Sequence, residues 1–169
     1  VIGAGMAGLA CATELARSGA SVIVLDKGRG PGGRMAARRV EISGETVSFD
    51  HGAQYFTARD PAFRAVVNAW EAAGVVARWP VAGDDAWVGT PGMNAPIRAM
   101  AQALDVRWGV RAEQLTREGA GWRVETDGGV FTAAQVLVAV PAEQAAVLLA
   151  EIAPELAAPL YVRDKVALT

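Results

Sequence analysis

Apolar runs alternate with glycine-rich turns along the chain, and the first of them predict a strand, a helix and a second strand. Only Val1 and Ile2 precede the first glycine as a strand stub. Apolar residues then recur at helical spacing over residues 6–18, and Gly19 follows as a helix end. Residues 21–25 form a continuous apolar run, typical of a parallel strand buried on both faces. This order predicts a right-handed βαβ unit of an α/β protein.

The later elements are shorter and of mixed type. Helices are expected at 61–73, 95–104 and 141–149, and strands at 40–42, 46–49, 106–112, 122–126, 130–132, 136–140 and 160–169. Asp60 is the expected N-cap of the first of these helices. The apolar run at 136–140 is again typical of a buried parallel strand, so the chain returns to the first sheet after an antiparallel excursion.

The first turn carries a phosphate-loop pattern. Gly3, Gly5 and Gly8 form a GxGxxG motif that follows the strand stub and opens the helix. In such a loop the first glycine permits the tight turn, the second lets a diphosphate approach, and the third lets helix and strand pack closely. Asp26 closes the second strand near the spacing expected for an acid that binds ribose hydroxyls. The alternative is that the glycines only mark a turn and that Asp26 is a solvated strand end.

A second glycine-rich loop, residues 27–34, follows this acid. Gly32 and Gly33 would let backbone N–H groups approach a phosphate, and Arg34 would add a charge-assisted contact. An NAD-binding domain needs no second glycine pair after its acid, so this loop favours FAD over NAD. The alternative is an ordinary exposed loop.

Composition narrows the class of protein. The 169 residues are 52% hydrophobic with a net charge of -2, and their scattered arginines form no basic stripe for nucleic acid. No apolar run reaches the roughly 20 residues of a membrane span. The single cysteine, Cys11, fits a reducing, cytoplasmic setting. No cluster predicts a metal site, and the short first strand predicts an N-terminal fragment of a longer protein.

These motifs carry a family resemblance. Residues 1–34 resemble the flavin-containing amine oxidase superfamily. Three further stretches, residues 26–35, the sequence Phe-Asp-His-Gly-Ala-Gln-Tyr-Phe at 49–56 and the Gly-Met-Asn at 92–94, are similar to the renalase-like NAD/FAD-dependent oxidoreductases within it.

The resemblance implies an α/β fold: a Rossmann-like FAD-binding domain of the glutathione-reductase type, with an inserted, incomplete α+β portion of a substrate domain. The implied domains are residues 1–58 and 104–150 for FAD binding, and 59–103 and 151–169 for parts of the substrate domain.

The expected cofactor is FAD. The expected cofactor-binding residues are Gly3, Gly5, Met6, Ala7, Gly8, Asp26, Lys27, Gly33, Arg34 and, by resemblance, Val110. The catalytic residues are unknown. His51, the only histidine, is a candidate for orienting flavin or substrate, and a structural role is its alternative. Trp79 and Trp87 are candidates for the substrate side.

The resemblance implies hydride transfer from a small reduced substrate to FAD, followed by reoxidation by oxygen. An amine and a dihydronicotinamide dinucleotide, an NAD(P)H-related compound, are the two donors considered, and the second is favoured. An NAD-dependent dehydrogenase and a non-catalytic nucleotide-binding module are the alternatives. The sequence gives no indication of the oligomeric state.

Overall fold

The computed structural model describes residues 1–162, and the chain divides into two compact units. The first unit combines Val1–Gly30 with the residues from Leu104 onward, and the second is Pro31–Ala103. Along the sequence, the second unit is therefore an insertion between two parts of the first. The expected mixed α/β fold is confirmed, because parallel strand pairing and helices occur together in the first unit.

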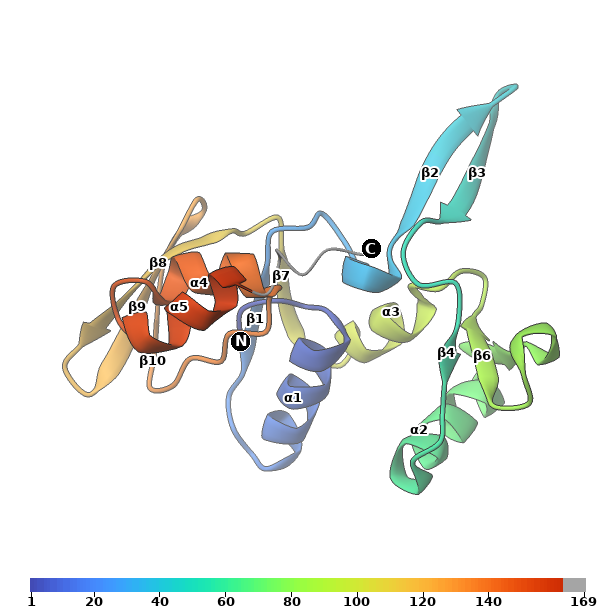
Figure 1. Ribbon diagram of the computed structural model, residues 1–169, viewed down its shortest axis with the longest axis horizontal. Helices are drawn as coiled ribbons and strands as arrows, with labels where there is room; N and C mark the ends of the chain where they lie inside the picture. Colours follow the sequence, from blue (N-terminus) through green and yellow to red (C-terminus); the bar gives the residue numbers. More distant parts are fainter. Residues whose placement is uncertain (163–169) are drawn as a thin grey trace. The chain divides into compact units, whose positions relative to one another are not determined.

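A small parallel sheet lies at the centre of the first unit (Figure 1). Strand β1 (Ile23–Asp26) pairs in parallel with β7 (Asp105–Trp108). Ile2 forms parallel bridges to β1 on one side and to Val138 on the other. Helix α1 (Met6–Arg17) connects Ile2 with β1, which is the crossover that a parallel pair requires.

An antiparallel sheet completes the first unit. Strands β8 (Ala112–Glu118), β9 (Gly121–Thr126) and β10 (Gly129–Ala133) form a meander with β9 in the middle. Helix α4 (Ala142–Leu149) packs against β8, and α5 (Pro154–Val162) packs against α4 (Figure 1).

One apolar core joins these two sheets and α4. Its buried members come from the parallel sheet, the meander and the helix: Ile2, Leu25, Leu115, Val124 and Leu148. Burial of one such side chain contributes about 1.5 to 3 kcal/mol. The core therefore fixes Ile2, and with it the start of the glycine loop that follows.

The second unit begins with a short 3-10 helix and a hairpin. The helix η1 (Gly33–Met35) leads into β2 (Ala37–Ile42), which pairs with β3 (Glu45–Asp50). Ser43 and Gly44 form the turn, with φ angles of 54° and 83°, as tight hairpin turns require.

A second small sheet and helix α2 form the core of this unit. Strand β6 (Ala86–Gly89) lies between β4 (Phe56–Thr57) and β5 (Val76–Arg78). Helix α2 (Pro61–Ala72) starts where the Asp60 carboxylate accepts the N–H of Phe63 at 2.9 Å. Their buried core consists of Ala58, Val67, Val76 and Trp87. The short helices η2 (Pro80–Ala82) and α3 (Ala95–Ala101) complete the unit.

Several predicted elements differ from the structure. The strand expected at 106–112 ends as β7 at Trp108, because Gly109 turns the chain with a φ of 72°, and β8, which begins at Ala112, was not predicted. The run at 136–140 pairs only through Val138. The strand expected at 160–169 is wrong where the structure describes it, since α5 continues to Val162; the rest of it lies outside the described residues. The helix expected at 95–104 ends at Ala101.

Candidate functional site

The three glycines of the first loop have different surroundings. A Cβ atom at Gly3, whose φ is 103°, would lie 2.6 Å from the carbonyl oxygen of Ala139. A Cβ at Gly8 would collide with the carbonyl of Gly3. A Cβ at Gly5, in contrast, would meet no atom within 4 Å. The fold itself therefore needs Gly3 and Gly8, whereas Gly5 borders the open space that a close ligand would occupy.

The first N–H groups of α1 have no hydrogen-bond partner among residues 1–162. Gly5 is the N-cap, no side chain caps the helix, and the first turn contains no acidic residue. The first hydrogen bond within the helix is donated by Leu9 to Gly5. Met6, Ala7 and Gly8 lie in this first turn, where the helix dipole is equivalent to roughly half a positive charge. This end of α1 suits an anion such as a diphosphate.

Asp26 connects three segments of the first unit. Its Oδ2 accepts the N–H of Ala4 at 2.7 Å, and its Oδ1 accepts the N–H of Gly28 at 2.7 Å. Its backbone carbonyl accepts the N–H of Val110 at 2.9 Å. A carboxylate has about four acceptor sites, so each oxygen keeps capacity for a ribose hydroxyl.

Val110 and Lys27 lie beside this acid in different ways. The N–H of Val110 donates to the backbone carbonyl of Asp26, and the neighbouring Gly109 donates to that of Gly28 at 2.8 Å. Residues 109–110 therefore lie side by side with residues 26–28. Lys27 is exposed and lies between Asp26 and Gly28. A contact of Val110 or Lys27 with FAD stays a prediction.

The second loop belongs to the other unit. Gly33 and Arg34 are exposed members of η1, and Met35 is buried beneath them. The carbonyl of Arg34 accepts the N–H of Ala53 at 2.8 Å, and a Cβ at Gly52 would collide with that carbonyl. Within residues 1–162 the guanidinium of Arg34 has no hydrogen bond or ion pair, so it is free to contact an anion.

His51 is exposed and contacts the same loop through its backbone. Its N–H donates to the carbonyl of Ala36 at 3.3 Å. No hydrogen bond of its imidazole ring occurs among the described residues, so neither a catalytic nor a structural role of the ring is tested.

Two residues outside the predicted cofactor-binding set also make contacts around the second loop. Asp50 Oδ1 accepts the N–H of Met93 at 3.0 Å, and the side chain of Asn94 donates to the carbonyl of Pro31 at 3.3 Å. Both lie in stretches that carried the family resemblance. The Asp-His-Gly and Gly-Met-Asn motifs could thus have pointed to Asp50 and Asn94. Their contacts around the second loop, however, are seen only in the fold.

The aromatic candidates separate into two kinds. Trp87 is only 2% exposed and belongs to the core of the second unit, which favours a structural role over the substrate-side role left open for it. Trp79 is partly exposed and forms an edge-to-face pair with Tyr55, their ring centroids 5.6 Å apart.

An ion pair lies in the same unit as this aromatic pair. Arg59 Nε donates to Asp85 Oδ2 at 2.5 Å. This hydrogen bond, and secondarily the positive charge of Arg59, hold the pKa of the Asp85 carboxyl below its ordinary value. Asp85 is therefore a structural acid rather than a proton donor near neutral pH.

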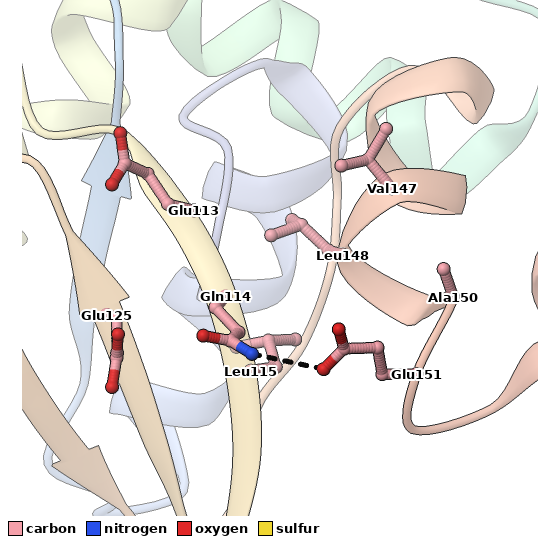
Figure 2. Close-up of a pocket in the computed structure, with 8 residues that line it drawn as sticks. All are labelled: Glu113, Gln114, Leu115, Glu125, Val147, Leu148, Ala150 and Glu151. Atoms are coloured by element: carbon pink, nitrogen blue, oxygen red, sulfur yellow. Dashed lines mark hydrogen bonds between the residues drawn. The ribbon is translucent and has the colours of Figure 1, made fainter.

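A cavity of about 340 Å³ lies between β8 and α4 (Figure 2). Its lining is acidic and apolar: Glu113, Gln114, Leu115, Glu125, Val147, Leu148, Ala150 and Glu151. The Gln114 side chain donates to Glu151 at 3.0 Å (Figure 2). None of the predicted cofactor-binding residues lines this cavity, and its glutamates would repel a diphosphate.

Residues 1–162 contain neither a cluster of metal ligands nor a membrane-spanning helix. No group of three or more His, Cys, Asp or Glu side chains is arranged to hold a metal ion. In the same range, every helix is too short or too polar to cross a membrane.

Known structures share the fold of this chain. A protoporphyrinogen oxidase homologue from Exiguobacterium sp. 255-15 is 14% identical with a TM-score of 0.67, over 92% of this chain and 62% of that one. Putrescine oxidase bound to putrescine is 16% identical with a TM-score of 0.66, over 87% and 58%. NikD, an amino acid oxidase, is 17% identical with a TM-score of 0.53, over 90% and 53%. The chain thus spans about three-fifths of the length of these relatives or less.

Two family models match the sequence itself. The NAD(P)-binding Rossmann-like domain matches residues 1–70, which contain both glycine loops. The model described as "Flavin containing amine oxidoreductase" matches residues 77–167, more than half of the chain. The resemblance to the amine oxidase superfamily is therefore confirmed, and the chain belongs to the flavin containing amine oxidoreductase family.

Proposed function

We propose that the full-length protein is an FAD-dependent oxidoreductase that takes a hydride from a small reduced substrate and passes the electrons to oxygen. The observation that carries this proposal is the N-terminus of α1. It has neither a capping side chain nor an acidic residue in its first turn, and open space borders Gly5. Family membership supports FAD as the group held there.

The residues of this chain fit the parts of FAD. The N–H groups of Gly5 and the first turn of α1 would bind the diphosphate. The carboxylate of Asp26 would accept the ribose hydroxyls. In the second unit, the exposed Arg34 would offer a positive charge to a phosphate group. Bound FAD supplies the hydride acceptor, so the protein has to provide position, charge and exclusion of water.

The carboxylate of Asp26 also disfavours nucleotides whose adenosine ribose carries a phosphate. A second negative charge on the ribose, as in NADP, would lie against this carboxylate and be repelled. The proposal therefore includes an unphosphorylated adenosine ribose at this site. The domain boundaries and the cytoplasmic location predicted from the sequence are also part of the proposal.

Among hydride donors, we favour a dihydronicotinamide dinucleotide over an amine. The support is the similarity to renalase-like proteins in residues 26–35, 49–56 and 92–94. An amine is the second candidate, because putrescine oxidase, which binds putrescine, shares the fold.

Anaerobic reduction distinguishes these donors. The FAD-loaded full-length protein is mixed with NADH, with its isomers hydrogenated at other ring positions, or with putrescine, and loss of the oxidised flavin band is followed. The proposal predicts rapid bleaching by one dihydronicotinamide and stoichiometric hydrogen peroxide when air is admitted. Bleaching by putrescine alone would favour an amine oxidase, whereas NAD-dependent turnover without flavin would favour a dehydrogenase.

A further inference from the structure

Three stretches far apart in the sequence meet within the second unit. Pro31, which directly precedes the two loop glycines, accepts a hydrogen bond from the Asn94 side chain at 3.3 Å across 63 positions. Asp50 accepts the N–H of Met93 at 3.0 Å across 43 positions. Residues 31–36, 50–53 and 92–94 therefore form one hydrogen-bonded group.

The segment at 92–94 is closely packed within the second unit. The Met93 side chain is 1% exposed, and its sulfur accepts the N–H of Gly89 at 3.3 Å. A Cβ at Gly89 would collide with the carbonyl of Gly92. Since the segment is packed this closely, its contacts hold other segments in place.

The segment at 50–53 links residues 92–94 to the second glycine loop through hydrogen bonds. Asp50 is fixed at its start by Met93. Ala53 donates to the carbonyl of Arg34 at 2.8 Å, and His51 donates to the carbonyl of Ala36 at 3.3 Å. The backbone carbonyls of Arg34 and of Ala36, two residues later, are thus tied to the segment that Asp50 begins.

We propose that Asp50 and Asn94 are positioning residues that set the affinity for FAD by holding the Gly33–Arg34 loop, without touching the cofactor. The proposal rests on the proposed function, because it assumes that Arg34 binds the diphosphate. A guanidinium on an exposed loop forms a directed contact only if its backbone is held. Asn94 holds the loop directly at Pro31, and Asp50 holds it indirectly, by fixing the segment whose N–H groups donate to Arg34 and Ala36.

The test measures FAD dissociation constants and melting temperatures of the full-length protein. Asp50→Ala and Asn94→Ala each leave a backbone group without its partner, and each is expected to weaken FAD binding by about tenfold. Asp50→Asn keeps the Oδ1 acceptor and should bind FAD within about twofold of the wild type. Asp60→Ala is the control, because it removes only the cap of α2 and should lower the melting temperature without changing FAD affinity.

A double variant shows whether these residues act through Arg34. If Asp50 acts through the loop, Asp50→Ala combined with Arg34→Ala should weaken binding by less than the product of the two single effects. Unchanged FAD affinity in Asp50→Ala and Asn94→Ala, or fully multiplicative effects, would overturn the inference. A wild-type protein that binds no FAD would instead contradict the proposed function, so the two failures are distinguishable.

Discussion

Asp26 Oδ2 accepts the N–H of Ala4 at 2.7 Å, although the two residues lie 22 positions apart in the sequence. The contact ties the first glycine loop to the end of β1. Since the other carboxylate oxygen accepts the N–H of Gly28, one side chain holds the segments on both sides of the proposed ribose site. Asp26 therefore combines a structural role with its proposed role in binding.

This double role predicts two separate effects of Asp26→Ala. Hydrogen bonds to a charged group contribute about 1.5 to 3 kcal/mol each, so the loss of both should lower the free energy of unfolding by about 3 to 6 kcal/mol. FAD binding should be lost as well. Urea unfolding of the apoprotein and flavin titration measure the two effects. Wild-type stability of the variant would show that the two hydrogen bonds do not support the loop.

Substitutions at Gly5 and Gly8 should act on different properties. Gly5→Ala adds a methyl group to open space, so stability should change by less than about 1 kcal/mol while FAD affinity falls by about tenfold or more. Gly8→Ala forces a methyl group against the carbonyl of Gly3 and should destabilise the fold by about 1 to 3 kcal/mol. Thermal melts and FAD titrations of both variants make the comparison. Full FAD affinity in Gly5→Ala would remove the diphosphate from this position.

Arg34→Ala should weaken FAD binding without affecting stability. Its guanidinium has no partner in the part of the chain that the structure describes, so no internal contact is lost. Loss of one charge-assisted contact corresponds to a dissociation constant about 10 to 100 times higher. Arg17→Ala is a suitable control, because Arg17 is an exposed arginine at the C-terminal end of α1 and forms an ion pair with the exposed Glu14. Equal affinities of the two variants would contradict the assignment.

The Arg59–Asp85 pair predicts a pH dependence of stability. Arg59 lowers the pKa of Asp85 in the folded state, so the pair stabilises the fold above the ordinary carboxyl pKa of about 4. This contribution is lost as the pH falls through the lowered pKa. Asp85→Asn should therefore melt below the wild type at neutral pH, and the difference should disappear in acid. Asp84→Asn, at an exposed neighbour, is the control; a difference that persists at low pH would point to another cause.

The elements predicted best were those determined by local pattern. Helix α2, for example, begins at its Asp60 cap as expected and ends one residue before the expected end, because capping and apolar spacing are properties of neighbouring residues. The meander strand β8 was missed because its residues are mostly polar and only Leu115 is buried. A strand with one solvated face has few apolar residues, so its pattern in the sequence is weak. The apolar pattern therefore predicted a strand only up to residue 112, where β8 begins.

The cofactor motifs were also visible in the sequence, but not the contacts that support them. The two glycine loops and Asp26 indicated FAD, and the family match confirms that cofactor. The contacts of Asp50 and Asn94 with segments 43 and 63 positions away depend on the fold, and no local pattern encodes them. The role of Trp87 stays open in the sequence because its strand, β6, is not predicted there.

Bound FAD is best detected in the visible absorption spectrum of the purified full-length protein, recorded before and after heat releases any cofactor. We expect flavin bands corresponding to about one FAD per chain, with the released cofactor identified as FAD. A colourless protein that also fails to bind added FAD would contradict the account and leave an NAD-binding or non-catalytic nucleotide domain.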